Sequence, residues 1–349
     1  MRRLPIYFLI DVSESMVGEQ IQHVEDGIAT IVKELKTDPT ALETVFLSVI
    51  VFAGQARTLI PLQELVQFYP TRLPIGGGTS YGRGLVHLMN EMRRDVVRTT
   101  PEQKGDWKPI VFFFTDGVPT DETTESAFRQ WNSDWGTSAN LVAISLGMET
   151  DLALLRELSE HAFHFKSATA EEYRKFFRWV TASIKQSSAS VETSAAGFNL
   201  AKLDHSGLEP APTLQKAPAF FKRASPFTII TARCMNSRRL YLMKYAQLAD
   251  GELGMPDYMV AYRLCGTYLL DNSYLELSAA DHQTMEMSTD QLIGSPSCPS
   301  CHNRFGFCIC TCGKVHCIGG EGEATCPWCG QTGSYSRMEG SAEVGQAQG

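Results

Sequence analysis

The stretch Asp11-Val12-Ser13-Glu14-Ser15 decides the fold class, because it closes the apolar run from Leu4 to Ile10 and precedes a helical pattern. A buried strand that stops at Asp-x-Ser-x-Ser places three oxygen side chains where the first strand of an α/β sheet meets its first loop. Ligands bind at such strand ends. Alone, the stretch would also suit an ordinary helix cap, so segments farther along the chain must decide.

Two distant segments favour a metal site over a cap. Gly76-Gly77-Gly78-Thr79-Ser80 precedes a second helical pattern, and Thr115-Asp116-Gly117 ends another buried strand. The glycine triplet lacks the lysine of a phosphate-binding loop. In a doubly wound sheet all three segments lie at the carboxyl ends of strands, on one rim. Two carboxylates and three hydroxyls form an all-oxygen shell that suits Mg²⁺ or Mn²⁺; its predicted ligands are Asp11, Ser13, Ser15, Thr79 and Asp116.

The first half of the chain alternates strands with helices. Apolar residues recur at helical spacing over residues 18–36 and 80–97, and continuous apolar runs at 44–53 and 109–115 indicate strands that are buried on both faces. Strands at 141–146 and 162–165 and helices at 122–134, 151–160 and 173–184 continue the pattern. We therefore predict a doubly wound, mostly parallel α/β sheet over residues 1–185.

The remainder of the chain is predicted to have three parts. Residues 186–219 are rich in Ser, Ala and Pro without apolar periodicity, which indicates a flexible linker. Residues 220–330 contain short strand patterns and form a small β-rich domain, and residues 331–349 form a disordered tail. Cys234 and Cys265 are isolated in this region and are interpreted as buried apolar residues.

Eight of the ten cysteines lie between Cys298 and Cys329, a clustering typical of metal ligation in a reducing compartment. Two matched C-P-x-C turns predict a zinc ribbon whose four thiolates come from Cys298, Cys301, Cys326 and Cys329. A closed thiolate shell leaves no position for water, so this zinc is structural.

The cysteines between the two turns are sufficient for a second zinc ion. Its candidate ligands are Cys308, Cys310, Cys312 and Cys317, with His302 or His316 in reserve. Another pairing stays open, in which Cys312 and Cys317 join Cys298 and Cys301 while Cys326 and Cys329 serve the other ion. Spacing alone does not choose between one zinc and two.

Composition excludes several classes of function. The 349 residues carry a net charge of −8, and from Pro226 onward 8 Lys and Arg face 12 Asp and Glu. This balance argues against nucleic acid and anionic membranes as partners. The N-terminal apolar run has seven residues and ends at Asp11, which is short for a signal peptide, and no run is long enough to cross a membrane. We expect a cytoplasmic protein.

These motifs resemble two known domains and one family. The DxSxS, Thr and TDG set resembles the metal-ion-dependent adhesion site of von Willebrand factor A domains, with all five positions filled. Combined with the C-terminal knuckles, it is similar to the TerY family of bacterial tellurite-resistance proteins. The resemblance implies a cytoplasmic, non-enzymatic component of stress-response systems that is associated with a PPM-type protein phosphatase and a protein kinase.

The chemistry of the oxygen site leads to a hypothesis about mechanism. Three neutral hydroxyls leave the ion more positive than several carboxylates would, and the resemblance implies that Asp11 and Asp116 act largely through water. A partner's Asp or Glu can then replace an exchangeable water on Mg²⁺. Two alternatives stay open: a metal-dependent hydrolase or phosphatase-like enzyme, and a nucleic-acid-binding zinc ribbon.

Overall fold

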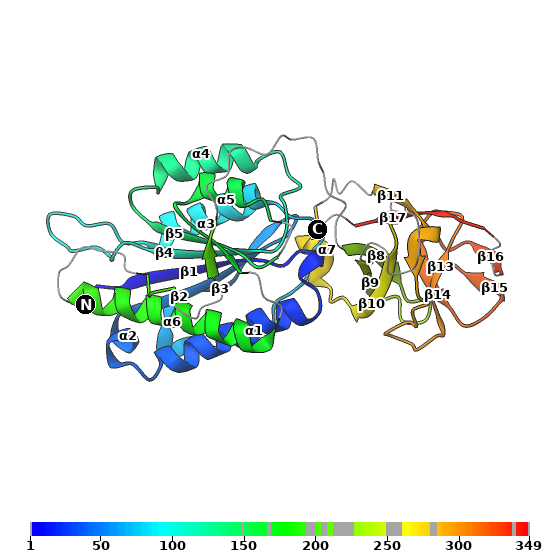
Figure 1. Ribbon diagram of the computed structural model, residues 1–349, viewed down its shortest axis with the longest axis horizontal. Coiled ribbons are helices and arrows are strands. Elements are labelled where there is room, and N and C mark those ends of the chain that lie inside the picture. Colours follow the sequence, from blue (N-terminus) through cyan, green and yellow to red (C-terminus); the bar gives the residue numbers. More distant parts are fainter. Residues whose placement is uncertain are drawn as a thin grey trace. The chain divides into compact units, whose positions relative to one another are not determined.

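The computed structural model of the chain describes residues 2–147, 150–165, 169–192, 200–203, 208–211, 227–248, 260–279, 285–336 and 340–347. The chain divides into two compact units (Figure 1). Unit 1 comprises residues 1–73 and 79–220, and unit 2 comprises residues 74–78 and 221–349.

Unit 1 is built on a seven-stranded sheet in the order β3-β2-β1-β4-β5-β6-β7. The strands are β1 (Leu4–Asp11), β2 (Val45–Phe52), β3 (Ala56–Glu64), β4 (Ile110–Thr115), β5 (Asn140–Ser145), β6 (His161–Phe165) and β7 (Leu208–Pro210). Pairing is parallel from β2 through β6 and antiparallel at the two edges, β3 and β7. This is the predicted doubly wound, mostly parallel sheet, and its strand order reverses direction between β1 and β4.

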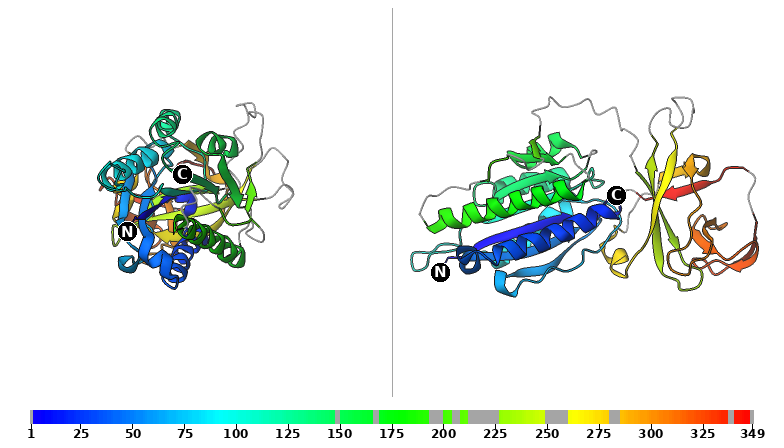
Figure 2. Two further views of the ribbon diagram at one scale, coloured as in Figure 1. Left: turned by 90° about the vertical axis from the view of Figure 1, so that its left-hand side faces the viewer. Right: turned by 60° about the horizontal axis from the view of Figure 1, so that its bottom comes forward.

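Helices cover both faces of this sheet (Figures 1 and 2). They are α1 (Glu19–Leu35), α2 (Pro39–Thr44), α3 (Tyr81–Asp95), α4 (Thr124–Asp134), α5 (Leu152–Leu158) and α6 (Ala170–Glu192), with short 3-10 turns at η1 (Glu14–Met16) and η2 (Leu65–Gln67). Alternate residues of each strand point to opposite faces. Phe113 therefore packs with the α3, α4 and α5 side, while Phe114 meets Phe176 and Phe177 of α6. Burial on both faces explains why the strands are continuously apolar.

The first unit extends beyond the predicted boundary at residue 185. Helix α6 continues to Glu192, because Ser187 and Ser188 are buried and Ser188 Oγ hydrogen-bonds Thr44 Oγ1 at 2.7 Å. Strand β7 then pairs with β6 inside the predicted linker, with Leu208 6% exposed. The prediction of a flexible linker from residue 186 was therefore wrong for residues 186–192 and 208–210, and residues 193–199, 204–207 and 212–219 lie outside the described parts of the chain. Serines on a buried helix face gave no apolar signal.

Unit 2 is β-rich, as predicted. Its six-stranded sheet has the order β12-β10-β9-β8-β14-β13, and two further ribbons pair β11 with β17 and β15 with β16. The strands are β8 (Phe227–Arg233), β9 (Leu240–Gln247), β10 (Tyr262–Leu269), β11 (Met285–Ser288), β12 (Leu292–Ile293), β13 (Phe305–Ile309), β14 (Val315–Ile318), β15 (Gly322–Thr325), β16 (Thr332–Tyr335) and β17 (Glu343–Gln346). Helix α7 (Ser273–Leu277) and the turn η3 (Thr289–Gln291) complete the unit.

The predicted disordered tail contains two strands instead. Thr332–Tyr335 pairs with β15, and Glu343–Gln346 pairs antiparallel with β11. Val344 is 2% exposed within the unit 2 core, and Ala347 N–H donates to the Ile229 carbonyl at 2.8 Å. The small-residue composition of residues 331–349 concealed these strands, because they are held by backbone pairing and by the buried Val344, without the run of apolar residues that predicts a strand.

No helix among the described residues is both long enough and apolar enough to cross a membrane.

Candidate metal sites

The predicted oxygen ligands meet at the point where the strand order of unit 1 reverses. Asp11 ends β1, Asp116 directly follows β4, and Thr79 lies just before α3. Neighbouring parallel strands whose connections depart in opposite directions leave a crevice at their carboxyl ends. The three segments converge there, although more than 100 residues separate the two aspartates in sequence.

Hydrogen bonds join four of the five predicted ligands. Ser13 N–H donates to Asp11 Oδ1 at 2.9 Å, and the hydroxyl oxygens of Ser13 and Ser15 lie 3.0 Å apart. Ser15 Oγ donates to Asp116 Oδ1 at 2.8 Å. Asp11 and Ser13 are fully buried, and Asp116 is 7% exposed. The loop after β1 therefore directs its oxygen atoms toward the end of β4.

The fifth residue, Thr79, has an unsatisfied hydroxyl. Its side chain is fully buried, and Oγ1 has no hydrogen-bond partner among the described residues. Thr120 holds the backbone of Thr79, because Thr79 N–H donates to Thr120 Oγ1 at 3.1 Å and the Thr79 carbonyl accepts from Thr120 N–H at 2.8 Å. A methyl group added at Gly117 would lie 3.9 Å from Thr79 Oγ1, so the hydroxyl sits beside the Asp116 turn. Buried hydroxyls normally find a partner, and a cation would supply one here.

The electrostatics of the rim also fit a cation. Burial, together with the charge of Asp116, raises the pKa of Asp11 to about 7, against hydrogen bonds from Ser13 and Thr115 that lower it. The neighbouring, buried carboxylates of Asp11 and Asp116 repel each other when both are ionised. A divalent cation between them would remove that repulsion, so the residues present fit the hard-cation site predicted from the sequence.

Sequence reasoning missed two residues that support Asp11. Thr115 Oγ1 donates to Asp11 Oδ2 at 2.7 Å, and the Tyr81 hydroxyl lies 3.0 Å from the same Thr115 oxygen. Tyr81 also donates to the Gly117 carbonyl at 2.6 Å. Burial raises the pKa of Tyr81 well above its usual value, so the phenol stays neutral. Thr115 could have been identified from its place next to Asp116 in the Thr115-Asp116-Gly117 motif, whereas no sequence pattern indicates a role for Tyr81.

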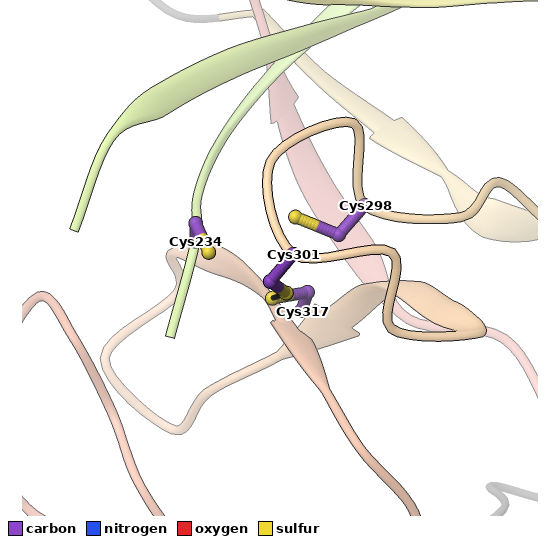
Figure 3. Close-up of side chains that lie close together, drawn as sticks. All are labelled: Cys234, Cys298, Cys301 and Cys317. Carbon is purple, nitrogen blue, oxygen red and sulfur yellow. Dashed lines mark hydrogen bonds between the residues drawn. The ribbon is translucent and has the colours of Figure 1, made fainter. Parts of the chain in front are cut away.

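The cysteines of unit 2 form two groups of four. In each group every pair of sulfur atoms lies within 4.8 Å. The first group, shown in Figure 3, joins the turn after β8, the loop before β13 and strand β14, and consists of Cys234, Cys298, Cys301 and Cys317. The second group joins the turn after β13 to the turn after β15 and consists of Cys310, Cys312, Cys326 and Cys329.

The sulfur separations fit tetrahedral metal ligation. A Zn–S bond of about 2.3 Å places the corners of a tetrahedron about 3.8 Å apart. The Cys301–Cys317 separation is 3.6 Å, Cys310–Cys329 is 3.8 Å and Cys312–Cys326 is 3.9 Å. A disulfide would need about 2.05 Å. The distances therefore match thiolates that share an ion and exclude disulfides between these pairs.

Backbone turns prepare both groups for thiolate ligands. Cys298, Cys326 and Cys234 each donate from N–H to the carbonyl five residues later and accept from the N–H four residues later. Each turn then has a left-handed residue: His302 at φ 61°, Gly330 at φ 76° and Arg238 at φ 61°. Ser237 N–H reaches Cys234 Sγ at 3.4 Å, as Trp328 N–H reaches Cys326 Sγ at 3.4 Å. Cys234 thus heads a knuckle of its own, in which Ser237 occupies the position of the second cysteine.

Hydrogen bonds lower the pKa of some thiols in the two groups, and burial raises the pKa of others. Burial raises the pKa of Cys234, but hydrogen bonds from Ser237 outweigh burial and lower the value to about 6. Burial also raises the pKa of Cys310, yet hydrogen bonds from the Cys312 backbone and Tyr335 bring it to about 6. Burial raises the pKa of Cys312 to about 12. One thiolate in each group is therefore ready to bind a cation near neutral pH.

The predicted pairing of the zinc ligands differs from this arrangement. Cys298 and Cys301 were placed with Cys326 and Cys329, but the structure divides them between the two groups, because β14 and the β8 turn lie beside the first knuckle. The open alternative with Cys317 beside Cys298 and Cys301 was right for Cys317 and wrong for Cys312.

Three cysteines were misassigned. Cys234 is in the first group and is not merely an apolar core residue, whereas Cys308 is in neither group. Burial raises the pKa of Cys308 to about 11, so its thiol stays protonated. Cys265 is exposed on β10 rather than buried, and His302 and His316 also lie outside both groups.

Comparison with known proteins identifies both units. Residues 6–178 match the von Willebrand factor type A domain, and residues 224–349 match the TerY-C metal binding domain. No curated protein matches the chain.

Among solved structures, a von Willebrand factor type A protein from Catenulispora acidiphila is 15% identical with a TM-score of 0.40, covering 52% of this chain and 43% of that one. Proximal thread matrix protein 1 from the mussel byssus, described with a zinc-occupied MIDAS motif, is 20% identical with a TM-score of 0.37, covering 52% and 45%. This chain therefore spans less than half the length of these two proteins.

Proposed function

The chain belongs to the TerY family, with a von Willebrand factor A domain followed by a TerY-C metal-binding domain, and from this we propose that it is a non-enzymatic, metal-dependent protein-interaction scaffold. Unit 1 binds a partner through a Mg²⁺ ion, or Mn²⁺, at the rim of its sheet. Unit 2 is stabilised by zinc in its two cysteine groups.

The buried hydroxyl of Thr79 carries this proposal. A threonine that only packed in the rim would find a hydrogen-bond acceptor or lie in water. Among the described residues Oγ1 of Thr79 has no partner, yet the backbone N–H and carbonyl of Thr79 both hydrogen-bond Thr120. An oxygen held in place without a partner, beside a pair of buried carboxylates, is organised for a cation.

The ligand set suits recognition of an acidic group. Thr115 orients Asp11 through its hydrogen bond to Oδ2, and Tyr81 lies next to the Thr115 hydroxyl. The ion would be held by Asp11, Ser13, Ser15, Thr79 and Asp116. The bound ion supplies a positive charge with a water-exchangeable position, which a carboxylate of the partner can occupy. With three hydroxyls in the shell, that charge is only partly neutralised by the protein.

The partners follow from the family rather than from geometry. We propose a PPM-type phosphatase and a protein kinase of the same system, acting in bacterial tellurite resistance and stress response. The resemblance of the five-residue motif and the TerY-C match support this assignment. The charge of −8 makes nucleic acid a poor alternative partner.

Retention of partners from a native lysate tests the proposal. Wild type with Mg²⁺ should retain a partner that is lost without Mg²⁺ and lost with Thr79→Val. A chelator selective for zinc over magnesium separates the two units, whereas EDTA would strip both metals. Thr30→Val, which removes a hydroxyl bonded to the Asp26 carbonyl on α1, is the matched control and should retain the partner. Retention by Thr79→Val without Mg²⁺ would refute docking at the rim.

The same samples test the absence of enzymatic activity. We expect no turnover of a phosphomonoester such as p-nitrophenyl phosphate in Mg²⁺ or Mn²⁺. Turnover that Asp11→Ala abolishes would establish a hydrolase instead.

A further inference from the structure

The two cysteine groups of unit 2 are joined by the turn that carries Cys234. Arg233, which precedes this ligand of the first group, stacks its guanidinium 4.0 Å from the Trp328 ring and donates to the Pro327 carbonyl at 3.4 Å. Arg238 in the same turn donates to the same carbonyl at 2.9 Å. Pro327 and Trp328 lie between Cys326 and Cys329. The Cys234 turn therefore holds the ligand turn of the other group.

A second connection runs through the side chains of Tyr335 and His316. Tyr335 hydrogen-bonds Cys310 of the second group, and its hydroxyl lies 3.1 Å from His316 Nε2. His316 Nδ1 lies 3.0 Å from the carbonyl of Cys317, a ligand of the first group. A carbonyl only accepts, so Nδ1 carries the proton. His316 is fully buried against the edge of the Tyr335 ring, which fixes the imidazole in place.

The ligand turn of the second group is also anchored to β14, the strand that carries Cys317. Trp328 Nε1 donates to the Val315 carbonyl at 2.7 Å, two residues before Cys317. Two connections and this anchor thus link backbone segments that supply ligands to different groups. The segment that supplies ligands to one group is therefore packed against segments that supply ligands to the other.

We propose that the two cysteine groups load metal cooperatively, so that filling either one raises the affinity of the other. Without metal, like-charged thiolates repel and their turns loosen, and ordering them is part of the cost of binding. An ion in one group orders the shared contacts in advance, so the second ion binds at a lower entropic cost. A coupling of ordinary size raises the second affinity by about 5- to 150-fold. The inference concerns metal loading alone and stands whether or not unit 1 docks a partner.

Counting ions per molecule tests the proposal directly. Metal-free full chain in reductant is titrated with Zn²⁺ in excess Mg²⁺, which occupies the oxygen site, and native mass spectrometry measures molecules with no, one and two zinc ions. Independent sites leave at least about half of the molecules with one zinc at half loading, and unequal affinities only increase that share. We expect a share well below this value. Because unequal affinities raise the share, a share at or above half overturns the proposal when Cys312→Ser also leaves the zinc affinity of the first group unchanged.

Single substitutions locate the coupling. Cys312→Ser damages the second group, and we expect zinc affinity at the intact first group to fall about fivefold or more in competition with a chromogenic chelator. Cys308→Ser removes a thiol from the same segment but from neither group, and should leave both affinities unchanged. If Cys312→Ser also leaves the first group unchanged, the groups are independent and the inference fails.

Substitutions of the connections test the route without touching a ligand. Arg238→Met and Tyr335→Phe should each raise the one-zinc share at half loading while both ions still bind at saturation. Arg239→Met is the matched control, since its side chain is exposed and does not share in the hydrogen bonds to the Pro327 carbonyl among the described residues. If the variants show the same one-zinc share as wild type, these contacts do not transmit the coupling between the groups.

Discussion

Replacing Thr79 by valine should stabilise the metal-free protein while weakening its response to Mg²⁺. The two side chains have nearly the same shape, so the change removes little besides a hydroxyl. That hydroxyl is buried without a partner in the described parts of the chain, and such a group costs about 1 to 3 kcal/mol of folding free energy. The metal-free variant should regain a similar amount.

Thr115→Val, a buried threonine of the same rim, is expected to have the opposite effect. Its hydroxyl donates to Asp11 Oδ2, so its removal leaves that buried carboxylate oxygen without this donor, whereas Tyr81 still donates to the Gly117 carbonyl. We expect a loss of about 1 to 3 kcal/mol in the metal-free state. The two substitutions thus use the same chemistry at neighbouring sites and differ only in whether the hydroxyl is bonded.

Magnesium narrows the stability advantage of Thr79→Val. At a Mg²⁺ concentration one hundred times the dissociation constant, wild type gains about 2.7 kcal/mol of stability. If loss of the ligand weakens binding tenfold, the variant gains only about 1.4 kcal/mol at the same concentration. Function at this rim is therefore maintained at the expense of metal-free stability.

Urea unfolding with and without Mg²⁺ measures both effects, with zinc kept saturating so that unit 2 is unchanged. Four of the five tryptophans lie in unit 1, so the fluorescence transition reports chiefly on that unit. Destabilisation of the metal-free protein by Thr79→Val would show that the hydroxyl has a native partner, and the argument for a cation at this rim would lose its main support.

Three further predictions address other parts of the structure. Gly27→Ala should lower the stability of unit 1 by about 1 to 3 kcal/mol in urea unfolding, because its methyl group would lie 2.1 Å from the Phe177 ring. In a Phe177→Ala background the same change should stabilise α1. If the free-energy changes of the two substitutions simply add, this packing is contradicted. Mg²⁺ affinity, measured by calorimetry, should be constant above pH 7 and fall about tenfold per pH unit below it, because the proton competes for Asp11, whose pKa is raised to about 7. The stability of the metal-free protein should decline as pH rises from about 4 to 7, since the folded state holds that proton more tightly than the unfolded chain does. A stability that stays flat over this range would contradict the raised pKa. Val344→Asp should destabilise unit 2 by more than about 3 kcal/mol in thermal unfolding, because it buries an unpaired charge in the core beside β11, whereas substitution in a disordered tail would have no effect.

The oxygen site could be located from the sequence because its ligands lie at strand ends. Asp11 and Asp116 each follow a run of apolar residues, and parallel strands of a doubly wound sheet must end on one edge. The topology brings them together whatever the details of packing. Tyr81 and Thr120 could not be predicted as part of the site, because their role depends on side-chain hydrogen bonds across that edge, which no local sequence pattern encodes.

The cysteine groups could be counted from the sequence but not paired. Matched C-P-x-C turns identify Cys298 with Cys301 and Cys326 with Cys329, since each pair lies within one turn. The partners of each pair depend on which strands are neighbours, and the pairing of β14 with β8 is parallel and joins residues more than 80 positions apart. Cys234 was therefore missed, although the left-handed turn at Asn236-Ser237-Arg238 marks a knuckle in retrospect.

The wide separation of the ligands has a consequence for synthesis of the protein on the ribosome. Cys234 emerges 83 residues before Cys317, the last ligand of its group, which at ordinary elongation speeds is an interval of about 4 to 17 seconds. During that interval the nascent chain carries thiols whose companions in the first group are not yet translated. Metal supply and a reducing environment must therefore be in place while the domain is being made, and a shortage of either would act on new chains before it acts on finished ones.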